Sequence, residues 1–146
     1  MRWNFLKASY GDCYFLYIDY DDKVFTILVD GGPKSAYAKW HRGRLVAGSL
    51  KEELKSMAEH GEHIDLLIIT HVDDDHIGGI LSWFMEEVPS PDFLREVWMN
   101  DDTEVNISEG LNNTAAQAAS LKKLMTDNGL ALRSQIVAGE TVMFDL

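Results

Sequence analysis

Cysteine is almost absent from this sequence, and so are the features that would assign it to several large classes of protein. The single cysteine, Cys13, excludes an intramolecular disulfide and a zinc site built from several cysteines. No apolar run approaches the roughly 18 residues that a membrane helix needs. The first residues also lack the apolar stretch of a signal peptide. We therefore expect a cytoplasmic protein that makes no membrane contact.

Basic residues are also scarce, since 13 Lys and Arg stand against 24 Asp and Glu and the net charge is −11. Such a chain does not bind nucleic acid or an anionic membrane through its overall charge. Metal ions bound to acidic ligands can still offset that charge locally. The one basic cluster runs from Lys34 to Arg44. We interpret it as a solvated loop, with a phosphate-contacting loop as the alternative.

Two catalytic motifs are missing as well. The sequence has no Gly-x-Ser-x-Gly segment, which would indicate a serine nucleophile at a strand-to-helix turn. It also has no Gly-rich loop that precedes a helix and could hold phosphates. With 146 residues, of which 46% are hydrophobic, the chain is long enough for one compact core.

Hydrophobic periodicity predicts alternating strands and helices in one domain over residues 1–146. Strands are expected at residues 2–8, 13–20, 24–29, 64–69, 94–99, 134–137 and 141–144. Capping boxes at Ser49 and Thr114 predict two helix starts, and helical spacing indicates a third helix over residues 77–88. Residues 70–79 are expected to form a loop. A hairpin combined with crossover helices predicts an α/β fold with a mixed sheet.

The loop that follows the buried strand 64–69 carries the chemistry. Its sequence is Thr70-His71-Val72-Asp73-Asp74-Asp75-His76-Ile77-Gly78-Gly79. Three carboxylates in so short a segment repel one another, and a divalent cation would relieve that repulsion. In an extended segment alternate side chains project to one side, so His71, Asp73 and Asp75 are expected to converge, joined by His76. The alternative is an acidic turn with helix-capping aspartates, but such a turn needs no histidine at either end.

This segment resembles the signature loop of the metallo-β-lactamase superfamily, in which a strand is followed by Thr/Ser-His-x-His-x-Asp-His-x-Gly-Gly. Asp73 stands where most members have the second histidine. Members with Asp there occur among the DNA-internalisation competence proteins and related bacterial hydrolases, which this sequence resembles most. The segments Gly11-Asp12-Cys13 and Asp30-Gly31-Gly32 are similar to the opening hairpin of the superfamily, whose Asp-Gly-Gly end typically braces the metal loop.

The resemblance implies a site with one or two divalent metal ions. It assigns His71 and Asp73 to the first metal, and Asp75 and His76 to the second. Asp75 is also implied as the catalytic group that orients or deprotonates a metal-activated water. Asp30, Thr70 and Gly78 are expected to surround these ligands without binding metal themselves. Carboxylate at position 73 favours manganese or magnesium more than imidazole does, and zinc also accepts carboxylate oxygen.

The same resemblance implies an α/β fold that is half of an αββα sandwich, because no histidine follows His76 to supply the later ligands. A fragment of a longer protein is our preferred interpretation. The alternatives are a chain that pairs with a C-terminal half, a partner chain or itself, and a module that keeps the loop without activity. The competence-protein resemblance favours a phosphodiester or nucleic-acid substrate. The alternative function is a catalytically inactive interaction module in a multi-protein system. Asn100-Asp101-Asp102 is expected to be an ordinary turn, with a place beside the metal loop as the alternative.

Overall fold

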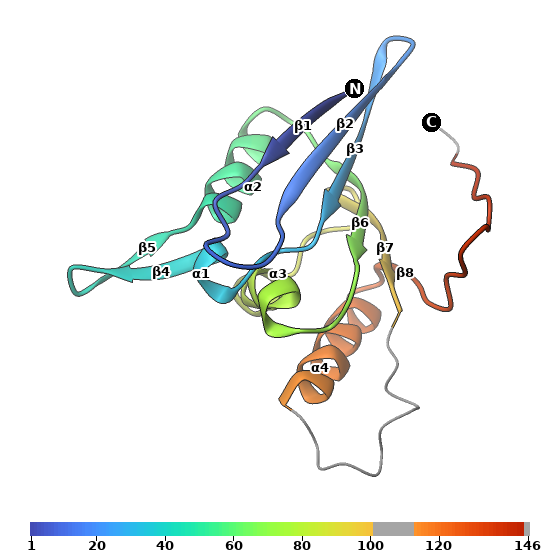
Figure 1. Cartoon of the computed structure of the whole chain (residues 1–146). Coiled ribbons are helices and arrows are strands. Elements are labelled where there is room, and N and C mark those ends of the chain that lie inside the picture. Colours follow the sequence, from blue (N-terminus) through green and yellow to red (C-terminus); the bar gives the residue numbers. More distant parts are fainter. Residues whose placement is uncertain (101–112, 145–146) are drawn as a thin grey trace.

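The computed structural model of the chain describes residues 1–100 and 113–144. These residues form a sheet with helices packed against one face, and a separate two-stranded hairpin (Figure 1). The strands are β1 (Arg2–Phe5), β2 (Tyr14–Tyr20), β3 (Lys23–Val29), β4 (Ala38–His41), β5 (Arg44–Ala47), β6 (Ile64–Ile69), β7 (Leu94–Met99) and β8 (Ala131–Arg133). The helices are α1 (Lys34–Tyr37), α2 (Ser49–Glu59), α3 (Asp74–Glu86) and α4 (Asn113–Asp127).

The main sheet has six strands in the order β1-β2-β3-β6-β7-β8. The first three strands pair antiparallel, whereas β3, β6, β7 and β8 pair parallel. Parallel neighbours require crossover connections, and α2, α3 and α4 lie on those connections. The predicted α/β fold with a mixed sheet is therefore confirmed. Because β3 and β6 run parallel, the segments that follow them leave the sheet at the same edge.

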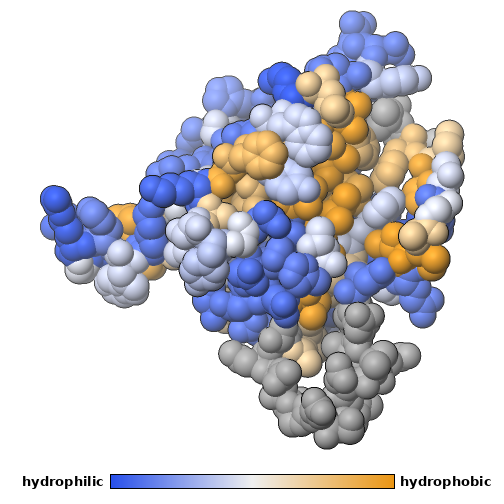
Figure 2. Space-filling model, in the orientation of Figure 1, coloured by the Kyte–Doolittle hydropathy of each residue, from blue (hydrophilic) through white to orange (hydrophobic). Residues whose placement is uncertain are grey.

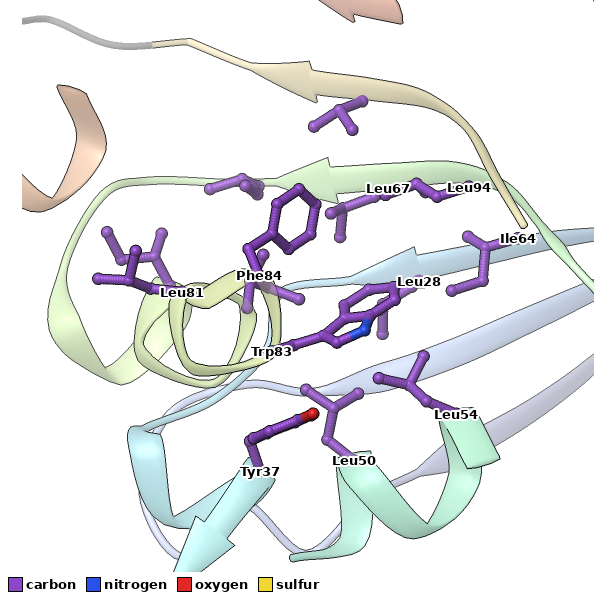
Figure 3. Packing of buried hydrophobic residues seen from close by; sticks show 14 of the residues in the cluster. Leu28, Tyr37, Leu50, Leu54, Ile64, Leu67, Leu81, Trp83, Phe84 and Leu94 are labelled. Carbon is purple, nitrogen blue, oxygen red and sulfur yellow. The ribbon is translucent and has the colours of Figure 1, made fainter. Parts of the chain in front are cut away.

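The core lies between one face of this sheet and the helices (Figure 3). A single row of side chains in register crosses four strands and is fully buried: Phe15, Leu28, Leu67 and Val97. Leucines of α2 and the aromatic pair Trp83 and Phe84 of α3 pack against this face. The hydrophobic spacing that predicted these helices thus places their apolar sides on the sheet.

The opposite face of the sheet is apolar too, although no helix among the described residues covers it. Trp3, Leu16, Ile27 and Leu66 form one row across this face. Figure 2 shows hydrophobic residues gathered in a band over the sheet. Phe144 covers part of the face, since its ring lies 5.0 Å from that of Phe25 on β3 and 5.7 Å from that of Trp98 on β7. Leu16 and Ile27 stay half-exposed, and Trp3 is 51% exposed.

The predicted closing pair of strands at 134–137 and 141–144 is wrong. The structure has one short strand, β8, and residues 134–144 have no regular secondary structure. Asn100 holds this segment beside the end of β7, since its Nδ2 donates to the Ile136 carbonyl and its Oδ1 accepts from the Ile136 amide. Asp101 and Asp102, predicted with Asn100 as a turn, lie outside the described residues.

The capping box predicted at Ser49 is also wrong. Helix α2 starts after Gly48, no side chain caps it, and Ser49 Oγ donates to the Lys7 carbonyl instead. The basic cluster from Lys34 to Arg44 is not the loop that we expected. It forms α1 and the β4–β5 hairpin, although its charged side chains are exposed.

Candidate metal centre

The metal loop is shorter than predicted because α3 begins at Asp74. The amides of His76 and Ile77 both donate to the Asp73 carbonyl and thereby close the first turn. Acidic side chains are stabilised near the positive end of a helix, which explains why Asp74 and Asp75 enter the helix and do not prolong the loop. The expectation that Asp75 projects from an extended strand beside His71 and Asp73 is therefore wrong.

His71, Asp75 and His76 nevertheless come together. One ligand atom of each lies within 4.8 Å of the other two. The ring centroids of the two histidines are 3.6 Å apart, and Asp75 Oδ2 is 3.6 Å from His76 Nε2. His76 is buried, Asp75 is half-buried and His71 is exposed, so the group opens to solvent on one side. Two imidazoles and a carboxylate form a donor set suited to a divalent transition metal.

Asp73 is the exception among the four predicted ligands. Its Oδ2 lies 3.7 Å from His71 Nε2, but the residue is exposed and does not belong to the group of three. The structure thus brings three of the four predicted ligands together. The fourth, Asp73, approaches only His71.

Asp30 directly follows β3 and is buried beside this group, with 1% of its surface exposed. Its Oδ1 accepts from the Thr70 amide at 2.8 Å, and its Oδ2 accepts from the Thr70 hydroxyl at 2.6 Å. The same Oδ2 is 2.9 Å from His76 Nδ1. Asp30 has φ of +54°, a conformation that Asp and Asn adopt more readily than other residues with side chains. The buried carboxylate therefore ties the carboxyl ends of two parallel strands to the first turn of α3.

These hydrogen bonds fix the proton on each imidazole. An ionised Asp30 can only accept, so His76 Nδ1 carries a proton, and in the neutral imidazole Nε2 then keeps its lone pair. The Thr70 hydroxyl gives its one proton to Asp30 and therefore accepts from His71 Nδ1, 3.0 Å away. Both histidines then present an unprotonated Nε2, which is the form that binds metal.

Asp12 is a residue that the sequence pattern marked only as part of a turn. It forms a second group with Asp30 and His76, in which ligand atoms again lie within 4.8 Å of one another. The Asp12 carbonyl also accepts from the Gly32 amide. The signal was available, because β2 and β3 pair antiparallel and the residues just before β2 must lie beside those just after β3.

Glycines let these segments touch backbone to backbone. A Cβ on Gly11 would lie 1.9 Å from the Asp75 carbonyl oxygen, and one on Gly79 would lie 2.0 Å from the Gly31 oxygen. A Cβ on Gly78 would lie 2.8 Å from the Lys34 nitrogen, so Gly78 lets α1 approach α3 closely.

The pattern of strand, metal loop and Asp-Gly-Gly turn can be compared with known families. The model of the metallo-beta-lactamase superfamily matches residues 7–87, which is more than half of the chain. The chain belongs to the metallo-β-lactamase superfamily. A search of curated proteins found no match. Membership indicates a metal-dependent, hydrolase-type domain, and the matched region spans β2, β3 and β6, the three helices from α1 to α3, and the candidate His/Asp site.

The charge around the site of this metallo-β-lactamase domain fits a divalent cation. Asp12, Asp30, Asp73, Asp74 and Asp75 all lie at this edge of the sheet, and Lys34 Nζ approaches them with 3.9 Å to Asp74. One ammonium group cannot balance five carboxylates, whereas one or two divalent ions would remove most of the excess. The donor set and its charge thus fit the metal dependence of the superfamily.

Cys13 is not a ligand candidate, although it lies near Asp30. Burial, and then the negative charge of Asp30, raise the pKa of its thiol from 9.0 to about 12. Its Sγ also belongs to neither of the two groups of potential metal ligands among the described residues.

Within the described residues, no helix combines the length and the apolar character that crossing a bilayer requires.

Proposed function

We propose that this chain supplies the metal-binding part of a hydrolase that cleaves phosphodiesters, of the competence-protein-like branch of the superfamily. The observation that carries the proposal is the Asp30 carboxylate that orients the imidazoles around Asp75. A buried carboxylate that orients two imidazoles is the arrangement expected around histidines that bind a metal ion through Nε2.

In this proposal His71 and His76 hold metal through Nε2. Asp75 is both a ligand and the group that orients or deprotonates the attacking water, while Asp73 becomes a ligand of the first metal after a small side-chain movement. A divalent cation held here would supply Lewis acidity, lowering the pKa of a bound water and polarising the substrate. Because the four proposed ligands combine two carboxylates with two imidazoles, manganese and zinc are our first candidates, and magnesium is also compatible.

The charge of the site supports the metal requirement of such a reaction. A phosphodiester is anionic, and five carboxylates would repel it from this edge of the sheet. Binding of one or two divalent ions removes that repulsion, so we expect substrate affinity itself to depend on metal.

We also propose that residues 1–146 form the N-terminal part of a larger metallo-β-lactamase-like domain. The support is the apolar sheet face, on which Leu16, Ile27 and Trp3 remain exposed or half-exposed. Contiguous apolar surface of this kind is usually covered in an assembly. A second apolar sheet, from a C-terminal half or a partner chain, would cover it. Dimerisation through this face is the expected state of the chain alone. We propose a cytoplasmic location, in keeping with one reduced cysteine.

The second candidate function is an inactive interaction module. The observation that favours it is that His71, Asp75 and His76 come from one six-residue segment, so this part supplies a partial coordination shell. Such a module would bind metal without turnover.

The deciding experiment measures metal content and hydrolysis of bis-p-nitrophenyl phosphate and a labelled oligonucleotide. It uses this chain and the longest reading frame that contains it, with manganese or zinc added. Asp75→Asn should abolish cleavage, whereas Asp127→Asn, an exposed carboxylate on α4, should not. Cleavage that survives Asp75→Asn would refute the catalytic assignment. Stoichiometric metal without any turnover would favour the inactive module.

A further inference from the structure

The β4–β5 hairpin extends away from the body of the molecule (Figure 1). Its four cross-strand pairs run from Ala38↔Ala47 to His41↔Arg44. Arg42 and Gly43 form the tip, with φ of +48° and +76°, as a two-residue primed turn requires. Among the described residues, no strand of the hairpin pairs with a strand of the main sheet, so the main sheet does not depend on the hairpin.

Its two faces differ in chemistry. Directly paired residues project to the same side, so Trp40 and Leu45 lie on one face and the pair His41 and Arg44 on the other, together with Lys39. Trp40 is 75% exposed and Leu45 is 61% exposed. The Trp40 side chain therefore buries little surface within the fold and is accessible to a ligand.

The charge of the arm is opposite to that of the protein. Residues 31–51 contain five Lys and Arg and no Asp or Glu, in a chain whose net charge is −11. Elsewhere some basic side chains pair with carboxylates, for example Lys55 with Glu59 and Lys123 with Asp127, whereas Arg2, Lys7 and Lys23 form no ion pair among the described residues. Within residues 1–100 and 113–144, Lys39, Arg42 and Arg44 form no ion pair. Figure 2 shows hydrophilic residues gathered at the projecting end.

The basic residues also lead to the metal loop. Lys34 starts α1, which continues directly into β4, and its Nζ lies 3.9 Å from Asp74. Helix α1 packs on α3, where the backbone of Lys34 meets Gly78. The basic residues therefore form a discontinuous track, with Lys39, Arg42 and Arg44 on the arm and Lys34 beside the edge that holds His71 and Asp75. A linear polyanion matches such a track better than a compact anion does.

We propose that the hairpin is a binding arm for single-stranded nucleic acid, in which Trp40 stacks on a base and Lys39, Arg42 and Arg44 contact phosphates. An exposed aromatic on which a base stacks and basic side chains that contact phosphates are the two features that bind single strands. Because Trp40 lies on one face and Lys39 and Arg44 on the other, the strand would cross an edge of the arm to reach both. The inference deepens the proposed function by naming the substrate class, and it rests on that function only for the claim that the bound strand is then cleaved. The arm offsets the acidic body locally, which explains how a protein of this charge can bind a polyanion.

The test is fluorescence anisotropy of a labelled 15-nucleotide oligo-dT with the full chain at low salt, in the presence of manganese. Trp40→Ala should weaken binding by between about fivefold and a hundredfold, whereas Trp40→Phe should retain most of it. Tyr20→Ala is the matched control, because Tyr20 is also an aromatic side chain, 58% exposed, but lies on β2. All of these side chains are on the surface, and unchanged melting temperatures will confirm folding.

The charge contribution is tested with the double variant Lys39→Ala/Arg44→Ala. Its control, Lys55→Ala/Lys123→Ala, changes the net charge equally at side chains that are 76% and 75% exposed. Loss of two phosphate contacts should reduce the slope of log affinity against log salt by about 1.4, and the control should leave that slope unchanged.

The inference is overturned if the parent chain does not bind the oligonucleotide, if both double variants bind alike, or if only phosphatidylserine vesicles bind the arm. These results are separable from the proposed function. Hairpin variants should keep full metal affinity, because Lys39, Trp40 and Arg44 do not belong to the metal groups. Oligonucleotide binding without cleavage would support the arm and refute the phosphodiesterase. Cleavage that is unchanged in the arm variants would support the phosphodiesterase and refute the arm.

Discussion

Oδ2 of Asp30 lies 2.9 Å from Nδ1 of His76, although the two residues are 46 positions apart in the chain. The contact joins the end of β3 to the first turn of α3 and selects the histidine tautomer with a free Nε2. Through the Thr70 hydroxyl, the same carboxylate also reaches His71. One buried carboxylate thus orients both imidazoles.

The first prediction concerns Asp30→Asn. An asparagine tolerates φ of +54° as aspartate does, so the backbone should persist. One carboxylate oxygen becomes an NH2 donor, so the side chain cannot accept from the Thr70 amide, the Thr70 hydroxyl and His76 Nδ1 together, and we expect metal affinity to fall by about 10- to 100-fold. Competition with a fluorescent zinc chelator measures this, and Asp127→Asn is the control. Unchanged affinity would show that Asp30 does not orient the ligands.

The second prediction concerns Asp73→His, which restores the histidine that most members of the superfamily have. Since imidazole is softer than carboxylate, the ratio of zinc affinity to manganese affinity should rise on the order of tenfold. Asp74→His is the matched control, because Asp74 is adjacent and faces Lys34 at 3.9 Å. Isothermal titration with each metal decides the matter. An equal rise in both variants would mean that position 73 is no ligand.

The third prediction separates a close contact from backbone strain. Gly11 and Gly43 both have positive φ, but a Cβ on Gly43 would meet nothing within 4 Å. Gly43→Ala should therefore cost about 1–2 kcal/mol of the free energy of unfolding, from strain alone. Gly11→Ala adds a clash with the Asp75 carbonyl, and we expect a total of about 2–5 kcal/mol. Urea unfolding measures both, and equal losses would contradict the predicted contact.

The fourth prediction concerns stability at alkaline pH. Burial, and then Asp30, raise the pKa of Cys13 from 9.0 to about 12, while burial, and then Glu53, raise that of Tyr17 from 10.0 to about 12. The folded state keeps these protons at pH values where the unfolded chain has lost them. The contribution of these two groups to the free energy of unfolding should therefore be fully present below about pH 9 and be lost as pH rises towards 12.

Urea unfolding at several pH values measures this decline, and Tyr17→Phe should reduce its slope. The thiol of Cys13 should also resist thiol reagents at pH 8 until the protein unfolds. Rapid labelling of the native protein would contradict the burial of Cys13.

Much of the sheet could be predicted from sequence, because its signals are local. The apolar run 64–69 and the segment 94–99 became β6 and β7 with the expected bounds. The strands predicted at 134–137 and 141–144 failed although residues such as Val142 and Phe144 favour strands. A strand needs a neighbour for its hydrogen bonds, and Phe144 instead packs its ring on the sheet face.

The hairpin β4–β5 was missed for a different reason. Its turn residues are Arg42 and Gly43, and arginine is not one of the residues that usually signal a primed turn. In the candidate site, the metal loop was recognisable by its motif, but the start of α3 at Asp74 and the place of Asp12 were not. The helix start is favoured by the acidic residues of its first turn, a local signal that an extended interpretation of the segment overlooks. The place of Asp12 follows only once β2 and β3 are paired.

The glycine contacts at the end of β3 also bear on how this site can change. The Gly31 amide donates to the His76 carbonyl, the Gly79 amide donates to the Gly32 carbonyl, and no side chain separates the two backbones. A substitution at one of these glycines cannot be absorbed by a rotamer change, so it must displace the whole facing segment. A change in the metal loop or in the Asp-Gly-Gly turn therefore requires a matching change in the other. Transplanting the loop into another scaffold should succeed only when the turn is carried with it.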